Sequence, residues 1–238
     1  MKHGLILVVG AVAALGCARL GVWQLSRLHE RQALNAAIQS QRARSPVTVT
    51  EALLRDDLDS LVQRRATAAG AFDFERQVVV WLRPLNGVPG VHVVTPLMVD
   101  DSLAVMVERA WLPSPDGALA DLALVREPTE AAVTGYLHRG ADTRQTPVGG
   151  GEFPLGVRSP DPLALGARFP YRLFPLVLRR STAPPDAGPM VRAVPDPPLT
   201  EGSHRSYAIQ WFGFATIALV GSVLLYRKAR AEDVGRET

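Results

Sequence analysis

Two apolar segments, one near each end of the chain, limit most strongly what this sequence can fold into. Residues 4–23 contain one charged side chain, Arg19, and residues 207–226 contain none. A helix of that length rises about 30 Å, which matches the hydrocarbon core of a bilayer. Aromatic residues typical of the membrane interface mark the segment ends: Trp23, Tyr207, Trp211 and Tyr226. We therefore predict a membrane protein with two transmembrane helices.

The first segment also admits two alternatives, a cleavable signal peptide and a lipoprotein signal. Residues 14–17 faintly resemble a lipobox that ends at Cys17. However, Leu15 lies one position too late for that motif, and the apolar run continues past Cys17. Because Cys17 is the only cysteine, an intramolecular disulfide and a Cys-ligated zinc cluster are excluded.

Two spans place both termini on the same side of the membrane. Lys2 precedes the first span, and three basic residues, Arg227, Lys228 and Arg230, follow the second. These favour cytoplasmic termini, whereas Arg27 and Arg31 on the other flank of the first span oppose that orientation. We expect both termini and the tail 227–238 in the cytoplasm and residues 24–206 outside it.

The two spans carry features of a helix hairpin. Small residues recur four apart, at Gly10, Ala14 and Ala18 and again at Ala218 and Ser222. Such stripes let helices approach closely, although alanine is also common in membrane helices. Each span also carries a glutamine beside a tryptophan near one interface, Gln24 and Gln210. Since a buried amide needs a partner in apolar surroundings, we expect these two side chains to bond across the hairpin.

The middle of the chain is typical of a soluble β domain. We expect helices near residues 25–42 and 51–64, the second capped by Thr50. Strands are predicted at 67–74, 77–82, 91–99, 103–111, 131–138, 173–180 and 190–194. Because these strands follow one another without helices, they favour a mainly antiparallel sheet or small open barrel. Residues 139–170 are irregular, and the proline-rich residues 184–198 form an extended strap.

Composition and motifs argue against several functions. The chain has 26 basic and 23 acidic residues, and a net charge of +3 is too small to indicate a nucleic-acid partner. The sequence contains no GxSxG, HExxH, Walker A or GxGxxG motif, and no two histidines have metal-ligand spacing. The carboxylate pairs Asp56-Asp57 and Asp100-Asp101 are typical of solvated surface. We therefore expect no enzyme.

The most informative residues lie at the outer membrane boundary. On a helix His204, Tyr207 and Trp211 share one face. We expect Tyr207 and Trp211 to contact a haem face or the membrane interface; the aromatic belt alone explains both, and a histidine here is commonly an ordinary interfacial residue. The sharper hypothesis is that His204 is an axial haem ligand, since neutral imidazole binds haem iron. Arg19 and Arg205 would then pair with the haem propionates.

Several blocks resemble the Surfeit locus protein 1 family, which assembles cytochrome c oxidase. The first span ends in LGVWQLSR at residues 20–27, and residues 70–72 match the family's Gly-x-Phe strand. Residues 87–97 are similar to its G-x-x-G…TPL stretch, and residues 107–113 to its RGW-x-P block. Residues 204–212 match the H-x-x-YA-x-QWF signature. The blocks occur in order and span nearly the whole chain.

The resemblance implies a helix hairpin anchor and an outer domain that helps to build the haem a-containing subunit I of an aa3-type oxidase. It implies membrane lipid, subunit I and haem A synthase as partners, and transiently bound haem a as cofactor, with His204 as candidate ligand. Arg109 and Trp111 would position the domain against the hairpin or a partner; a strand-end ion pair and a core tryptophan are the alternative.

The chain begins almost directly with a span and shows no Arg- and Ser-rich transit segment, so we expect a bacterial plasma membrane. Two other functions stay open: a scaffold that stabilises oxidase subunits without touching haem, and an anchored structural or sensory module of the envelope.

Overall fold

The computed structural model describes residues 2–54, 57–140 and 151–234. The chain divides into two compact units. One unit comprises residues 1–37 and 198–238 and consists mainly of two long helices. The other comprises residues 38–197 and contains all the strands.

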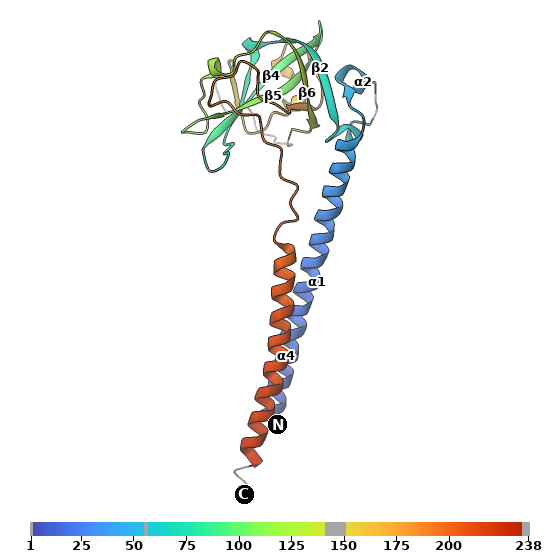
Figure 1. Ribbon diagram of the computed structural model, residues 1–238, viewed down its shortest axis with the longest axis vertical. Helices are drawn as coiled ribbons and strands as arrows, with labels where there is room; N and C mark the ends of the chain where they lie inside the picture. Colours follow the sequence, from blue (N-terminus) through green and yellow to red (C-terminus); the bar gives the residue numbers. More distant parts are fainter. Residues whose placement is uncertain (1, 55–56, 141–150, 235–238) are drawn as a thin grey trace. The chain divides into compact units, whose positions relative to one another are not determined.

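Helices α1 (Lys2–Ala43) and α4 (His204–Val234) lie side by side and run antiparallel (Figure 1). Both contain a window apolar enough to cross a membrane, with mean hydropathy of 2.2 and 1.8. Only 11% of each window is buried, so most of these apolar side chains face outward, unlike those of a helix in a soluble core. The expected terminal helices are confirmed, and the helix expected near 25–42 is the continuation of α1.

The two helices meet along a line of small and polar residues, which we call the seam. On α4 the least exposed residues alternate in steps of four and three: His204, Ala208, Trp211, Ala215, Ala218 and Ser222. On α1 the buried Ala14, Gly21 and Leu28 recur every seven residues. A Cβ atom on Gly10 would lie 2.2 Å from the Ser222 Cβ, so only glycine permits this approach.

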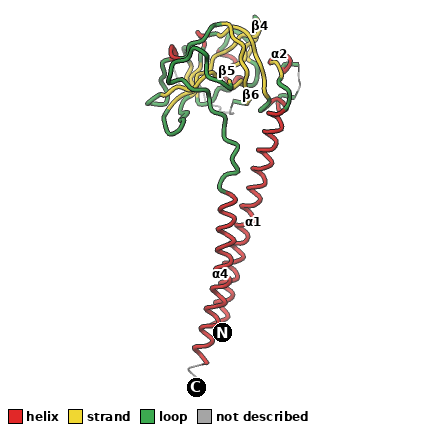
Figure 2. The backbone as a smooth tube through the Cα atoms, in the orientation of Figure 1, coloured by secondary structure: helices red, strands yellow, loops and turns green. Residues whose placement is uncertain are grey.

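Five strands of the second unit pair in a closed ring. They are β2 (Arg65–Phe72), β6 (Glu130–His138), β9 (Val177–Arg180), β5 (Leu103–Pro113) and β4 (Gly90–Asp100). The ring closes where Ala71 and Phe72 of β2 pair with Met98 and Leu97 of β4. Four of its five pairings are antiparallel and β5–β9 is parallel. The mainly antiparallel barrel is thus confirmed, and Figure 2 shows its strands in yellow.

Short elements surround the ring. The additional strands are β1 (Val47–Thr48), β3 (Val78–Val80), β7 (Leu155–Val157) and β8 (Arg172–Leu173). The short helices are α2 (Val49–Ala52) and α3 (Pro162–Leu165), with 3-10 turns at Asp59–Leu61, Phe74–Arg76, Leu122–Leu124 and Gly166–Arg168. Residues 139–170, expected to be irregular, therefore supply β7 and α3; residues 141–150 of that stretch lie outside the described residues.

Alternate residues of the ring strands fill its interior. On β5 the buried Val105 and Val107 belong to the same apolar cluster as Leu137 of β6 and Leu178 of β9. The intervening Met106 belongs to a second cluster outside the ring, which includes Phe169. Because both faces of β4 and β5 are covered, these strands are buried at almost every position rather than at alternate positions.

The helix predicted over residues 51–64 is wrong. The structure instead has the four-residue α2, capped by Thr48 rather than Thr50: Thr48 and Glu51 form a reciprocal capping box. Asp57 then accepts hydrogen bonds from the backbone N–H groups of Asp59 and Ser60. A side chain that bonds the backbone locally competes with helical hydrogen bonds, so a separate 3-10 turn forms there.

Two predicted strands also need correction. The strand expected at 173–180 is divided into β8 and β9, because Pro175 lies between them and lacks the N–H that a ladder requires. The strand expected at 190–194 is a single bridge, in which Arg192 and Trp111 exchange backbone hydrogen bonds of 2.8 and 3.0 Å. The proline-rich sequence around it cannot supply a full ladder.

The close contact between β6 and β9 makes a prediction about stability. A Cβ atom on Gly135 would lie 1.9 Å from the Arg179 carbonyl oxygen, so Gly135→Ala must separate the strands. We expect the substitution to lower the free energy of unfolding by about 1–3 kcal/mol, the usual cost of overpacking. Chemical denaturation of the full chain in detergent measures this. Gly166→Ala is the control, since nothing lies within 4 Å of its Cβ position; equal stability of the two variants would contradict the prediction.

Candidate functional site

His204 occupies the end of the seam, where it is half-buried and is the first residue of α4. Its Nδ1 lies 2.8 Å from the Gln24 Oε1 of α1. An amide oxygen only accepts hydrogen bonds, so Nδ1 donates the proton, and in the neutral imidazole Nε2 carries the lone pair. The sequence thus places one imidazole nitrogen in a fixed bond between the helices and leaves the other available.

The loop before α4 approaches the available nitrogen. Gly202 has φ of +70°, a left-handed conformation that glycine adopts without strain. A Cβ atom on Gly202 would lie 3.6 Å from the His204 Nε2, so a larger side chain would begin to cover this nitrogen. Two further bonds in the same unit hold the loop on α1: Gln32 Nε2 donates to Glu201 at 2.9 Å, and Asn35 donates to the Thr200 carbonyl at 3.3 Å.

Three other candidate residues of α4 differ in how exposed they are: Arg205, Tyr207 and Trp211. Trp211 lies on the seam two turns further on and packs edge to face against Phe214, with ring centroids 5.9 Å apart. Tyr207 is 47% exposed and stands at the edge of the seam. Arg205 is exposed, so its guanidinium is free to reach an anionic group beside His204.

Arg19 and Trp23 belong to a different face of α1. Gln24 follows Arg19 by five positions, which turns the two side chains about 140° apart around the helix axis. Arg19 and Trp23 instead line an apolar groove on α1 together with Gly16 and Leu20. The structure therefore does not bring Arg19 beside Gln24, the residue that holds His204.

The bond expected between Gln24 and Gln210 is not formed. Gln24 bonds His204 instead, and Gln210 is exposed. The reason is helical geometry: Gln210 follows the buried Ala208 by two residues and so points about 200° away from it, off the seam. The need of a buried amide for a partner was the correct signal, but it led to the wrong partner.

The donor set at this end of the helix pair fits a haem ligand. Histidines that bind metals commonly donate the other ring N–H to a fixed oxygen, which orients the ring. His204 has this arrangement, with Gln24 as the orienting group. A neutral imidazole at an apolar boundary is a common axial ligand of haem iron. Arg205 is exposed next to His204 in the chain, whereas Arg19 lies on another face of α1.

Arg109 and Trp111 both lie inside the β domain. Arg109 is 1% exposed, donates to Glu127 Oε1 at 2.7 Å, and lies over the rings of Phe72 and Phe74. The β4–β5 register shifts between Val93 and Val94, which leaves Arg109 without a Cα partner on β4. Such a bulge redirects a side chain.

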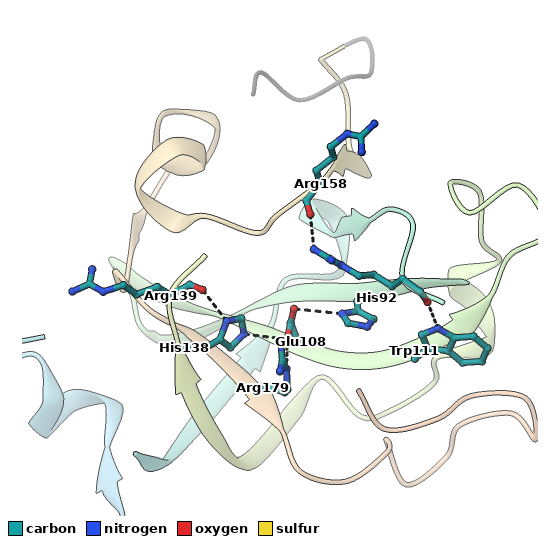
Figure 3. Close-up of polar contacts among 8 residues, drawn as sticks. His92, Glu108, Trp111, His138, Arg139, Arg158 and Arg179 are labelled. Atoms are coloured by element: carbon teal, nitrogen blue, oxygen red, sulfur yellow. Dashed lines mark hydrogen bonds and ion pairs between the residues drawn. The ribbon is translucent and has the colours of Figure 1, made fainter. Parts of the chain in front are cut away.

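Trp111 is 5% exposed, and its Nε1 donates to the Arg83 carbonyl at 2.6 Å (Figure 3). The strap covers it through the bridge with Arg192. The polar partners of Arg109 and Trp111 in the described part of the chain thus belong to the β domain.

Sequence reasoning missed a buried ionic cluster around Glu108 (Figure 3). Glu108 is 2% exposed and accepts hydrogen bonds at Oε2 from Arg179 Nε at 2.7 Å and His138 Nε2 at 3.0 Å. His92 Nδ1 lies 3.5 Å from Oε1, too far for a strong hydrogen bond. The signal in the sequence was the adjacent charges Glu108-Arg109 inside an otherwise apolar strand.

The partners of Glu108 determine its ionisation. Burial alone would raise the pKa of Glu108, but the contacts with His138 and His92 and the charge of Arg179 outweigh it and hold that pKa well below its usual value. His138 Nδ1 also faces a carbonyl oxygen, that of Arg139, at 3.0 Å. Within residues 2–54, 57–140 and 151–234 this cluster has no geometry suited to a metal ion. The ion pair with Arg179 and the lowered pKa of Glu108 mean that the cluster stabilises the folded state while Glu108 is ionised.

Because the pKa of Glu108 is low, we expect the stability of the β domain to depend on pH. A carboxyl group whose pKa is lower in the folded than in the unfolded state stabilises the folded state fully at pH values above the unfolded-state pKa, here about 4.5. That stabilisation is lost as the pH falls from there through the folded-state pKa. At pH 7 we expect Glu108→Gln to lower the free energy of unfolding by about 3–5 kcal/mol, because it leaves the Arg179 guanidinium without its carboxylate partner. Denaturant unfolding at pH 7 and pH 3.5 should show that the gap between variant and wild type narrows in acid.

The control for that measurement is Glu75→Gln, because the Glu75 side chain is 88% exposed. Its stability should follow that of the wild type at both pH values. A Glu108→Gln variant with wild-type stability at pH 7 would contradict the ionic role of the cluster.

Two comparisons relate this chain to known proteins. The model of the SURF1 family matches residues 11–216, a range that includes most of the first apolar helix, the whole β domain and the start of α4. The chain is also similar to the cytochrome oxidase assembly protein SHY1 of Saccharomyces cerevisiae, with 29% identity over 94 residues. That match covers 39% of this chain and 24% of the yeast protein, so the chain spans about a quarter of that relative's length. Because the family model covers most of the sequence, the chain belongs to the SURF1 family.

Proposed function

We propose that this protein is an assembly factor for an aa3-type cytochrome c oxidase and that it holds or presents haem a for insertion into subunit I. The family match and the name of the yeast relative support a role in oxidase assembly. The observation that carries the finer proposal is the state of His204, with Nδ1 bonded to Gln24 and Nε2 available. Handing over a cofactor requires binding and release, which such a site can supply without a catalytic group.

Each residue at the end of the seam has a distinct task in this proposal. Haem a supplies an iron that takes an axial nitrogen ligand. His204 offers Nε2, and Gln24 fixes the ring plane and the tautomer. Trp211 offers an apolar ring surface on the same helix face, and the exposed Tyr207 and Arg205 form the polar edge. Half-burial leaves His204 able to release what it binds.

The proposed location is a bacterial plasma membrane, with both termini in the cytoplasm. Two helices long and apolar enough to span a bilayer support membrane insertion, and an even number of spans returns the chain to the same side. The basic residues Arg227, Lys228 and Arg230 after the second apolar run support the orientation. Subunit I and haem A synthase are the proposed partners, with no enzymatic activity.

The second candidate function is a scaffold that stabilises oxidase subunits without binding haem. The barrel interior is filled with packed side chains, so the β domain offers its surface to partners, as a scaffold would. The two functions differ at His204, because a scaffold needs the fold but no available imidazole nitrogen.

Substitution at the end of the seam tests the haem proposal. In a strain that lacks the gene, we expect plasmid-borne wild-type protein to restore the haem a band in reduced-minus-oxidised membrane spectra. His204→Ala should leave that band at the level of the deletion strain. Gln24→Leu should weaken haem binding about 10- to 100-fold, as loss of an orienting hydrogen bond does. Haem that copurifies with the detergent-solubilised protein gives a second, direct readout.

The control is His29→Ala, which removes an exposed histidine from α1. It should behave as wild type in both measurements, with equal protein levels by immunoblot. If His204→Ala restores oxidase fully, the scaffold function is favoured. If the deletion itself leaves haem a and oxidase activity unchanged, the assembly proposal fails and the function of an envelope module is favoured.

A further inference from the structure

A second site lies within the β domain, where neighbouring ends of β2, β6 and β9 meet. Arg65 of β2 is paired directly with Tyr136 of β6, and Gly135, the residue before Tyr136, is paired with Arg180 of β9. These strand ends line a cavity of about 450 Å³, and the strap residues Val194, Pro195 and Asp196 form its other wall. This volume is within the range of small-molecule sites.

The cavity contains arginine donors without acceptors. Arg180 is 8% exposed and uses Nη1 to donate to Glu127 Oε2 at 2.5 Å. Its remaining N–H groups have no other acceptor among the described residues, and they retain access to solvent. Arg65 is exposed and has no ion-pair partner in that part of the chain. Two guanidinium groups therefore face one cavity with unused donors.

The local charge balance is positive. Asp196 is the carboxylate in the described lining, and it already pairs with Arg42 at 3.4 Å. Glu127, behind Arg180, is shared with Arg109. Across this group, the four arginines at positions 42, 65, 109 and 180 face two carboxylates, which leaves a net charge of +2. A cavity with this excess attracts an anion.

The walls are fixed before any ligand arrives. The Arg42 guanidinium lies 4.7 Å from the centre of the Tyr136 ring, which holds both side chains in place. Val194 of the strap is 4% exposed, and prolines at 195 and 197 restrict the backbone beside it. A preformed site loses little entropy on binding.

We infer that this cavity binds an oxyanion, a carboxylate or phosphate group, carried on a small apolar body. Arginine forks match the paired oxygens of both groups, and the exposed Ser181 hydroxyl adds a donor. The apolar body lies against the strap, at Val194 and Pro195. The inference does not depend on oxidase assembly, because it uses residues of the β domain alone.

Calorimetric titration of the full chain in a neutral detergent at low ionic strength tests the site. The probes are phenyl phosphate, benzoate and inorganic phosphate. We expect the two organic anions to bind more tightly than inorganic phosphate, and binding to weaken as salt increases. Arg65→Gln should weaken binding about tenfold or more, the usual effect of losing one hydrogen bond between charged groups. Arg65→Lys should retain part of the affinity.

The matched control is Arg172→Gln, which removes one charge from an exposed arginine outside the cavity lining. Stronger binding of phenyl phosphate than of benzoate identifies phosphate as the preferred group, and the reverse order identifies carboxylate. The inference is overturned if none of the probes binds at millimolar concentration, or if Arg65→Gln and Arg172→Gln weaken binding equally. Both arginines are at the surface, so neither variant should prevent folding.

Discussion

The β domain depends on charges that are buried in pairs across β5 and β9. Glu108 lies directly opposite Arg179, and each is followed by a second charge, Arg109 and Arg180. Neighbouring residues on a strand point to opposite faces. Glu108 and Arg179 therefore contact each other in the Glu108 cluster. Arg109 and Arg180 both pair with Glu127 instead, near Phe72 of the barrel core. Since a buried charge without its partner is costly, these contacts favour the register in which Glu108 lies opposite Arg179.

The sequence was sufficient to predict the two apolar helices, most of the strands and the mainly antiparallel barrel. These features depend on local periodicity and composition, which a single sequence contains. The failures have local physical causes. Asp57 accepts hydrogen bonds from the backbone of Asp59 and Ser60 and so favours a separate turn within the predicted 51–64 helix, and Pro175 divides the strand predicted at 173–180. Closure of the ring through β2 and β4 depends on long-range pairing, for which the sequence carries no periodic signal.

The candidate site was predictable in part. His204 was identified from its position at the membrane boundary and from its family motif, but its partner Gln24 lies 180 residues away. Choosing between Gln24 and Gln210 required the rotation of each helix about its axis. Residues of four strands form the Glu108 cluster. Residues of three strands and of the strap line the cavity at Arg65 and Arg180. Charged residues within apolar strands were the available clue to both.

The alternation of four and three residues along the seam has a consequence for the hairpin as a whole. An average repeat of 3.5 residues makes two helices coil around each other with a left-handed twist. A slide by one heptad in either direction, about 10 Å, would move Gly10 away from Ser222, a contact that only glycine permits, and would also change the partner of His204. In either slipped state His204 would stand opposite Cys17 or Arg31, and neither side chain offers an amide oxygen. The His204–Gln24 bond therefore selects one alignment of the coil, as a single polar residue does in a leucine zipper.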